Sequence, residues 1–145
     1  MSKLAVIGAG SWGTTFAKVL ADGGNEVMLW ARRPELADEM NSFHRNGDYL
    51  PGVNLPHNLS ASSQIEEVLK NAKQVYLSVP SQTLRANLSE WGNLIPDTAI
   101  VVSLMKGVEK DSGLRMSQVI ASMGIPEDRI VVVSGPNLAL EIAAE

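Results

Sequence analysis

Short apolar runs alternate with longer segments of helical period along the whole chain, and this alternation constrains the fold more than any other feature. The runs that we interpret as strands lie at residues 3–8, 26–31, 57–61, 74–79, 98–104 and 129–134. Strands that alternate with helices are typical of parallel βα units. Because Val, Ile and Leu are nearly continuous in the first and the last two runs, we expect both faces of the sheet to be covered. The pattern predicts an α/β fold, with a doubly wound, mainly parallel sheet and helices on both faces.

Residues typical of helix starts and loops separate these runs. Ser63 and Glu66 have capping-box spacing, and Pro34 suits the first turn of a helix. From Asn46 to Pro56 the chain has two prolines, two glycines and no clear period, which predicts an exposed loop. Long loops at strand ends often carry function, so this segment is a candidate for binding.

Composition narrows the classes of function. The chain has 145 residues, 45% of them hydrophobic, which suits one domain with a single core. A net charge of −4 argues against a nucleic-acid partner or a membrane surface. The first apolar run is too short for a signal peptide or a membrane span, so we expect no membrane insertion. Since cysteine is absent, disulfides and thiolate metal sites are excluded, and we expect a cytoplasmic protein.

The two histidines add no chemistry of their own. His44 and His57 have no acidic or serine partner at telling spacing, so the sequence predicts neither a catalytic triad nor a metal site. We expect both to be surface residues.

Three glycines directly follow the first predicted strand. Gly8, Gly10 and Gly13 have the spacing of a dinucleotide fingerprint and precede a predicted helix. In such a turn the first glycine permits the tight bend, the second lets the backbone approach a pyrophosphate, and the third allows close helix packing. The helix N-terminus, near Ser11, attracts the anion. The motif predicts a Rossmann-type dinucleotide site, and the alternative is a turn that merely requires glycine.

Two arginines follow the second predicted strand. NAD-preferring folds place an acidic residue there, which holds the ribose 2′-hydroxyl. Here Arg32 and Arg33 occupy this place, and guanidinium groups bind a 2′-phosphate where a carboxylate would repel it. NADP(H) is therefore favoured as cofactor, while NAD(H) stays possible. The alternative is a pair of solvated arginines at a helix start.

The last third of the chain holds further candidates. Lys106 follows a strand that should end at the carboxyl edge of the sheet, where its ammonium could meet a phosphate. A solvated loop lysine is the alternative. Gly135 and Pro136 predict a turn, and Asn137 could cap the next helix. That helix is barely two turns long, so we expect a domain cut from a longer protein.

Six motifs together resemble the bacterial-type NAD(P)-dependent glycerol-3-phosphate dehydrogenases. They are "GAGSWGTTFA" (8–17), "WARR" (30–33), "YLPG" (49–52), "SVPS" (78–81), "MKGVE" (105–109) and "SGPNLALEIA" (134–143). The resemblance runs the full length of the chain. It implies interconversion of dihydroxyacetone phosphate and sn-glycerol 3-phosphate, the backbone precursor of phospholipids.

The resemblance also assigns roles to individual residues. It implies that Ser11 and Trp12 contact the dinucleotide, although Trp12 could instead pack beneath a second domain. The other implied contacts are Arg32, Arg33 and Tyr49 around the adenosine end, Lys106 to cofactor and substrate, Gly135 and Asn137 near the substrate, and Ala139 near the dinucleotide.

Members of this family are about twice as long as this chain. The resemblance therefore implies that residues 1–145 are an N-terminal dinucleotide-binding domain and that a later helical domain supplies the lysine acting as general base. We assign no catalytic residue within this chain and expect the fragment to be poorly active or inactive. A homodimer is one assembly open to the full-length protein. The alternatives are a related dehydrogenase of 3-hydroxy acids or ketopantoate, and a non-catalytic Rossmann module that senses NADP(H).

Overall fold

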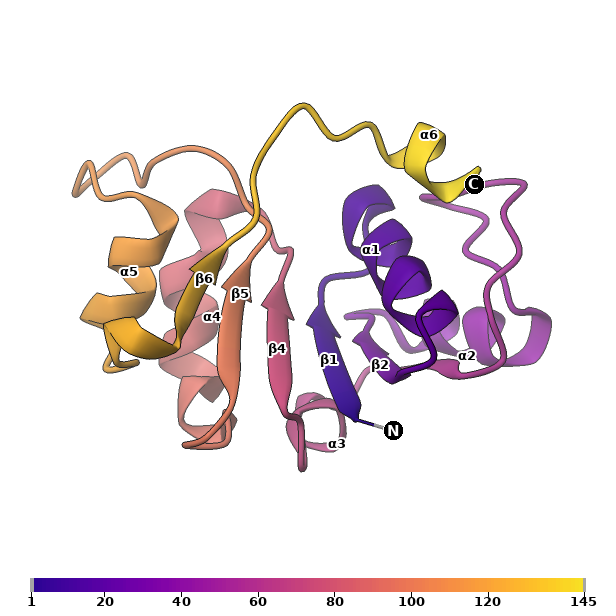
Figure 1. Cartoon of the computed structure of the whole chain (residues 1–145), viewed down its shortest axis with the longest axis horizontal. Coiled ribbons are helices and arrows are strands. Elements are labelled where there is room, and N and C mark those ends of the chain that lie inside the picture. The colour runs from indigo at the N-terminus through magenta and orange to yellow at the C-terminus, as the bar shows by residue number, and fades with distance from the viewer. Residues whose placement is uncertain (1, 145) are drawn as a thin grey trace.

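A single parallel sheet organises the chain, for which the computed structural model describes residues 2–144. Its strand order is β3-β2-β1-β4-β5-β6, and every neighbouring pair is parallel (Figure 1). The strands are β1 (Lys3–Ile7), β2 (Glu26–Trp30), β3 (Leu59–Ser62), β4 (Gln74–Leu77), β5 (Ile100–Ser103) and β6 (Ile130–Val132). All six expected strands are confirmed, and the third begins two residues later than expected, at 59 rather than 57. The order reverses between β1 and β4, which creates a crevice at the carboxyl ends of these strands.

Helices connect the strands. They are α1 (Ser11–Asp22), α2 (Pro34–Phe43), α3 (Ile65–Leu69), α4 (Leu84–Trp91), α5 (Met116–Ser122) and α6 (Ala139–Ala143). As predicted, Pro34 is the first residue of α2. The predicted capping box at Ser63 and Glu66 is wrong, because the N-cap of α3 is Gln64. The hydroxyl of Ser62, the last residue of β3, accepts the backbone N–H of Gln64 at 3.1 Å. The turn therefore begins one residue earlier than the capping pattern implies.

Helices cover both faces of the sheet, which confirms the doubly wound architecture. Helices α1 and α2 bury one apolar core against the sheet, and α3, α4 and α5 bury the other. Successive residues of β1 face opposite cores, since Val6 belongs to the first and Ile7 to the second. Both side chains are fully buried, which accounts for the continuous apolar run in this strand.

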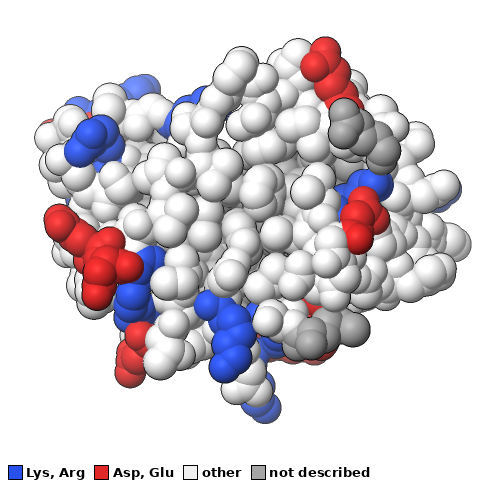
Figure 2. Space-filling model, in the orientation of Figure 1, with Lys and Arg blue, Asp and Glu red and all other residues white. Residues whose placement is uncertain are grey.

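The last strand departs from this picture. Val131 and Val132 of β6 are 44% and 53% exposed, so the expectation that both faces are covered is wrong here. Strand β6 is the edge of the sheet, and within residues 2–144 no helix lies over it on the side of α1 (Figure 1). Figure 2 shows few charged side chains across the centre of this face. Val131 pairs with Val102 and lies on this face, whereas Val132 points to the other face, so the exposed, low-charge part of this face is the edge strand β6.

The end of the chain returns over the carboxyl edge of the sheet. From β6, residues 133–138 cross above β5 and β4 to α6, which lies beside the N-terminal half of α1 (Figure 1). The Thr15 hydroxyl of α1 donates to the carbonyl of Ala139 at 3.4 Å. None of the helices within the described residues is long and apolar enough to cross a membrane.

Candidate functional site

The glycine turn between β1 and α1 is closely packed at Gly8 and Gly13 and open at Gly10. Gly8 has a φ of +117°, and a Cβ there would lie 2.2 Å from the backbone oxygen of Ser78, just beyond β4. A Cβ on Gly13 would lie 2.0 Å from the carbonyl oxygen of Gly8. A Cβ on Gly10 would meet nothing within 4 Å. The first and third glycines thus allow close packing of α1 against the sheet, and the second leaves free space above the backbone.

That free space belongs to a cleft of about 690 Å³ at the carboxyl edge of the sheet. Its walls follow β1, β2 and β4, the strands around the reversal of strand order. Eight of the residues predicted to bind cofactor line it: Gly8, Gly10, Ser11, Trp12, Gly13, Arg32, Arg33 and Tyr49. The structure thus brings together the glycine turn and the arginine pair, which are separate in the sequence.

The arginine pair has an acidic neighbour. Arg33 donates from Nη2 to the carboxylate of Asp48 and forms an ion pair with it. This hydrogen bond raises the pKa of Arg33 above its ordinary range. Both side chains are about half exposed, at 49% for Arg33 and 53% for Asp48, so the pair remains open to exchange with a competing anion.

The loop after α2 is exposed over most of its length, as expected, but buried residues anchor it. Asn46 is fully buried, and Leu50 is buried as well. The Asn46 amide donates to the carbonyl of Ala9 at 3.0 Å and to Thr14 Oγ1 at 2.9 Å, and its oxygen accepts the N–H of Tyr49 at 3.1 Å. One buried side chain therefore ties this loop to the glycine turn.

A second bond joins the same two segments at the surface of the cleft. The Ser11 hydroxyl donates to the carbonyl of Tyr49 at 2.6 Å. Tyr49 is thus held through its N–H by Asn46 and through its carbonyl by Ser11. These bonds place the Tyr49 side chain on the wall of the cleft.

A smaller cleft of about 280 Å³ lies beside the first. Its walls are Trp12, Leu104, Lys106 and Asn137. The Lys106 ammonium donates to the carbonyl of Gly135, and the Asn137 N–H donates to the same carbonyl at 2.9 Å. The three predicted substrate residues therefore lie together. Gly135 and Ala139 are not among the residues that line the two clefts.

The predicted cap at Asn137 is wrong. The N-cap of α6 is Leu138, and no side chain caps this helix. The turn at Gly135 uses the backbone N–H of Asn137, so its side chain stays on the wall of the smaller cleft.

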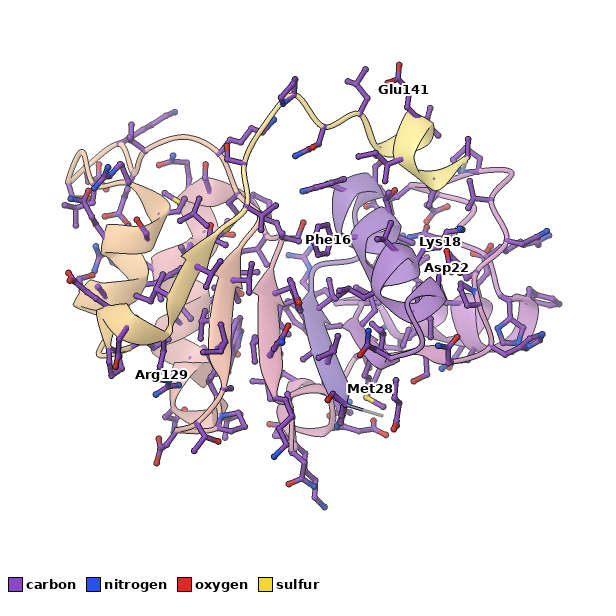
Figure 3. The ribbon with its side chains drawn as sticks, in the orientation of Figure 1. Phe16, Lys18, Asp22, Met28, Arg129 and Glu141 are labelled. Atoms are coloured by element: carbon purple, nitrogen blue, oxygen red, sulfur yellow. The ribbon has the colours of Figure 1, made fainter. Side chains whose placement is uncertain are left out.

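Trp12 belongs to both clefts. Its ring packs edge-on against Phe16 with centroids 5.4 Å apart, and Phe16 packs against Tyr76 of β4 at 5.3 Å. Figure 3 shows Phe16 projecting from α1 toward β4. The three rings fix the indole at the boundary between the clefts, since offset and edge-to-face aromatic contacts favour one orientation.

The two histidines, which are separate in the sequence, contact each other. Nδ1 of His57 lies 3.2 Å from Nε2 of His44, and the two rings cross edge-on at 4.3 Å. His57 is exposed, whereas His44 is only partly exposed at the end of α2. Within residues 2–144, no cluster of three or more His, Cys, Asp or Glu side chains could hold a metal ion.

Sequence reasoning missed several residues that line the larger cleft, and two that bond to its lining residues Tyr49 and Arg33. Asn46 and Asp48 lie in the segment interpreted as a loop, and nothing in its pattern distinguishes a buried asparagine from an exposed one. The far wall adds Trp30 together with Thr83, Ala86, Asn87 and Glu90, which come from α4 and the turn before it. The spacing of Ala86, Asn87 and Glu90 predicts that they share one face of a helix. It does not predict that this face meets the cleft.

Comparison with known proteins assigns the family. Residues 3–145 match the family model described as the N-terminus of NAD-dependent glycerol-3-phosphate dehydrogenase. The chain belongs to this dehydrogenase family. This result favours the dehydrogenase over the two alternative interpretations, a sensing module and a 3-hydroxy acid or ketopantoate enzyme.

Individual members of the family agree over nearly the whole chain. It is 61% identical over 142 residues to a glycerol-3-phosphate dehydrogenase [NAD(P)+] from Leifsonia xyli, with 97% of this chain and 38% of that protein covered. It is 56% identical to the enzyme of the same name from Corynebacterium urealyticum, with 99% and 43% covered. The crystal structure of glycerol-3-phosphate dehydrogenase from Coxiella burnetii aligns with a TM-score of 0.87 at 34% identity, covering 99% of this chain and 43% of that one. The chain thus spans about two fifths of the length of these dehydrogenases.

Proposed function

We propose that this chain is the dinucleotide-binding domain, residues 1–145, of an NAD(P)-dependent glycerol-3-phosphate dehydrogenase. The proposed reaction interconverts dihydroxyacetone phosphate and sn-glycerol 3-phosphate. The observation that carries the proposal is the larger cleft, in which the open Gly10 and the Arg32–Arg33 pair line one continuous wall. Names of curated relatives support the same reaction class.

The chemistry of this wall fits a dinucleotide. The free space above Gly10 admits a pyrophosphate next to the N-terminus of α1, whose first N–H groups favour an anion. A bound nicotinamide supplies the hydride of such a reaction. In this proposal the residues of the chain bind and orient the cofactor, and Trp12 excludes water from the boundary between the clefts.

We further propose that NADP(H) is the preferred cofactor. Arg32 and Arg33 lie on the wall contributed by the end of β2, where the ribose of a dinucleotide binds in this fold. Two guanidinium groups offer bidentate, charge-assisted hydrogen bonds to a 2′-phosphate. Tyr49 lines the same part of the cleft and would complete the adenosine end.

The smaller cleft is the proposed substrate side. Lys106 offers an ammonium to a phosphate group, and Gly135 and Asn137 shape the turn beside it. We assign the general base to a part of the protein outside residues 1–145, so this chain alone should turn over poorly. The exposed valines of the edge strand β6, in a region of low charge, support a contact with such a part (Figure 2).

Two further expectations belong to the full-length protein. A cytoplasmic location fits the absence of cysteine, and a role in supplying the phospholipid backbone follows from the proposed reaction. A homodimer is the simplest symmetric assembly for a soluble enzyme of this kind.

The cofactor proposal is tested by calorimetric titration of the chain with NADPH and with NADH in the same buffer and salt. Replacing both Arg32 and Arg33 with alanine should weaken NADPH binding by about a hundredfold, since charge-assisted hydrogen bonds contribute about 1.5 to 3 kcal/mol. NADH binding should change far less. Arg115→Ala removes an exposed guanidinium outside both clefts and is the matched control. Equal losses for the two cofactors would refute the assignment of the 2′-phosphate to this pair.

A further inference from the structure

The ion pair between Arg33 and Asp48 places a carboxylate where the fold normally has one, although it comes from a different loop. In NAD-preferring Rossmann folds the acidic residue at the end of β2 accepts a hydrogen bond from the ribose 2′-hydroxyl. Arg32 and Arg33 take that place in this chain. Asp48, which follows fifteen residues later, brings its carboxylate onto Arg33.

Hydrogen bonds hold the backbone on both sides of Asp48, so the position of its carboxylate next to Arg33 is fixed by the fold. The Asn46 side chain accepts the N–H of Tyr49, and the Ser11 hydroxyl donates to the Tyr49 carbonyl. Asn46 is itself buried and bonded to the glycine turn through Ala9. Asp48 lies between these anchored residues, and its carboxylate contacts Arg33, which lines the cleft.

We propose that Asp48 is a specificity-determining residue of the cofactor site, and this inference rests on the proposed function. Its carboxylate neutralises Arg33 and offers an acceptor to a 2′-hydroxyl, which favours NAD(H). A 2′-phosphate must displace the carboxylate from Arg33 and meets its negative charge, which disfavours NADP(H). The site thereby combines a pair of guanidinium groups with a carboxylate and accepts both cofactors.

The inference predicts opposite effects of one substitution on the two cofactors. Asp48→Asn keeps the shape of the side chain and removes its charge, so Arg33 becomes available to a 2′-phosphate. NADPH binding should strengthen by about fivefold, the upper range for an exposed ion pair. NADH binding should stay level or weaken, because NADH has no 2′-phosphate to bind the freed guanidinium and its 2′-hydroxyl loses a charged acceptor.

The experiment measures dissociation constants for NADPH and NADH with the chain, its Asp48→Asn variant and an Asp97→Asn control. Asp97 is an exposed carboxylate just before β5, at the opposite edge of the sheet, so its variant carries the same change in net charge away from the cleft. The ratio of NADPH to NADH affinity should rise about fivefold for Asp48→Asn and stay constant for Asp97→Asn. Circular dichroism verifies that the three proteins are equally folded.

The outcomes separate this inference from the proposed function. If the unmodified chain binds neither cofactor, the proposed function fails, and the inference fails with it. If the unmodified chain binds cofactor and Asp48→Asn leaves the affinity ratio unchanged, only the inference is refuted. A rise of the same size in Asp97→Asn would also refute it, because net charge rather than position would then account for the effect.

Discussion

Replacing Asn46 with alanine should both destabilise the chain and loosen the larger cleft, the proposed cofactor site. The substitution removes two donated hydrogen bonds, to Ala9 and Thr14, and one accepted from Tyr49. Asn46 and Thr14 are fully buried, so water does not readily take over these partners. The net value of such a bond is about 1 kcal/mol, and a buried group left without a partner costs about 1 to 3 kcal/mol.

These values combine to a loss of about 3 kcal/mol in the free energy of unfolding. That is a large part of the 5 to 15 kcal/mol that stabilises a typical domain, yet it leaves the variant folded at moderate temperature. The midpoint of urea denaturation, followed by circular dichroism, measures the loss. Since Tyr49 loses its anchor, NADPH should also bind about tenfold more weakly when most of the variant is folded.

Asn58→Ala is the matched control for this prediction. The Asn58 amide donates two hydrogen bonds of 2.7 Å, to the carbonyls of Ala21 and Asn25, next to the amino end of β3 and away from the cleft. Its loss should lower stability by about 2 kcal/mol without changing cofactor affinity. The reasoning is refuted if Asn46→Ala is as stable as the unmodified chain, or if both variants lose the same cofactor affinity.

Three further substitutions test other features of the structure. Gly13→Ala places a Cβ 2.0 Å from the Gly8 oxygen and should lower the free energy of unfolding by about 3 kcal/mol. At Gly10 the added Cβ meets open space, so Gly10→Ala should keep its stability and bind cofactor more weakly. Denaturation midpoints measure the first effect, and titration with NADPH measures the second. The Arg85 guanidinium lowers the pKa of Glu109 below its ordinary value of 4.5, so the contribution of this carboxylate to stability is complete above about pH 5 and is lost as the pH falls through the lowered value. The stability advantage of the unmodified chain over Glu109→Gln should therefore shrink in acid denaturation series below pH 4.5, and a constant difference between pH 7 and pH 3 would contradict this.

The elements that sequence reasoning located correctly are those with a local physical cause. Strands β1, β4 and β5 are short apolar runs, and a run buried on both faces needs no partner information to be recognised. Pro34 starts α2 because its fixed φ and missing N–H suit a first helical position. The glycine turn is likewise local, since Gly8 requires a positive φ and Gly13 a close approach.

The features that sequence reasoning missed depend on contacts between distant segments. Asn46 is buried because the loop folds back over Ala9 and Thr14, more than thirty residues away. Val131 and Val132 have the pattern of buried strand residues, and only their place at the sheet edge leaves them exposed. The contact between His44 and His57 arises because the two ends of the intervening loop meet. No local propensity encodes such pairings.

The sequence identifies the candidate residues one by one, but it does not show which of them lie together, because that depends on the order of the strands in the sheet. Every βα unit places its loop at the carboxyl edge, so the sequence predicts a row of loops without saying which are neighbours. Because β4 lies next to β1, the turn at Gly8 meets Ser78, and the larger cleft extends from β2 to α4. Lys106 follows β5, one strand further along, and so lines the smaller cleft. Trp12 lines both clefts. Its large side chain in the glycine turn therefore stands between the loops of β1, β2 and β4, which form the larger cleft, and the loop of β5, which forms the smaller one.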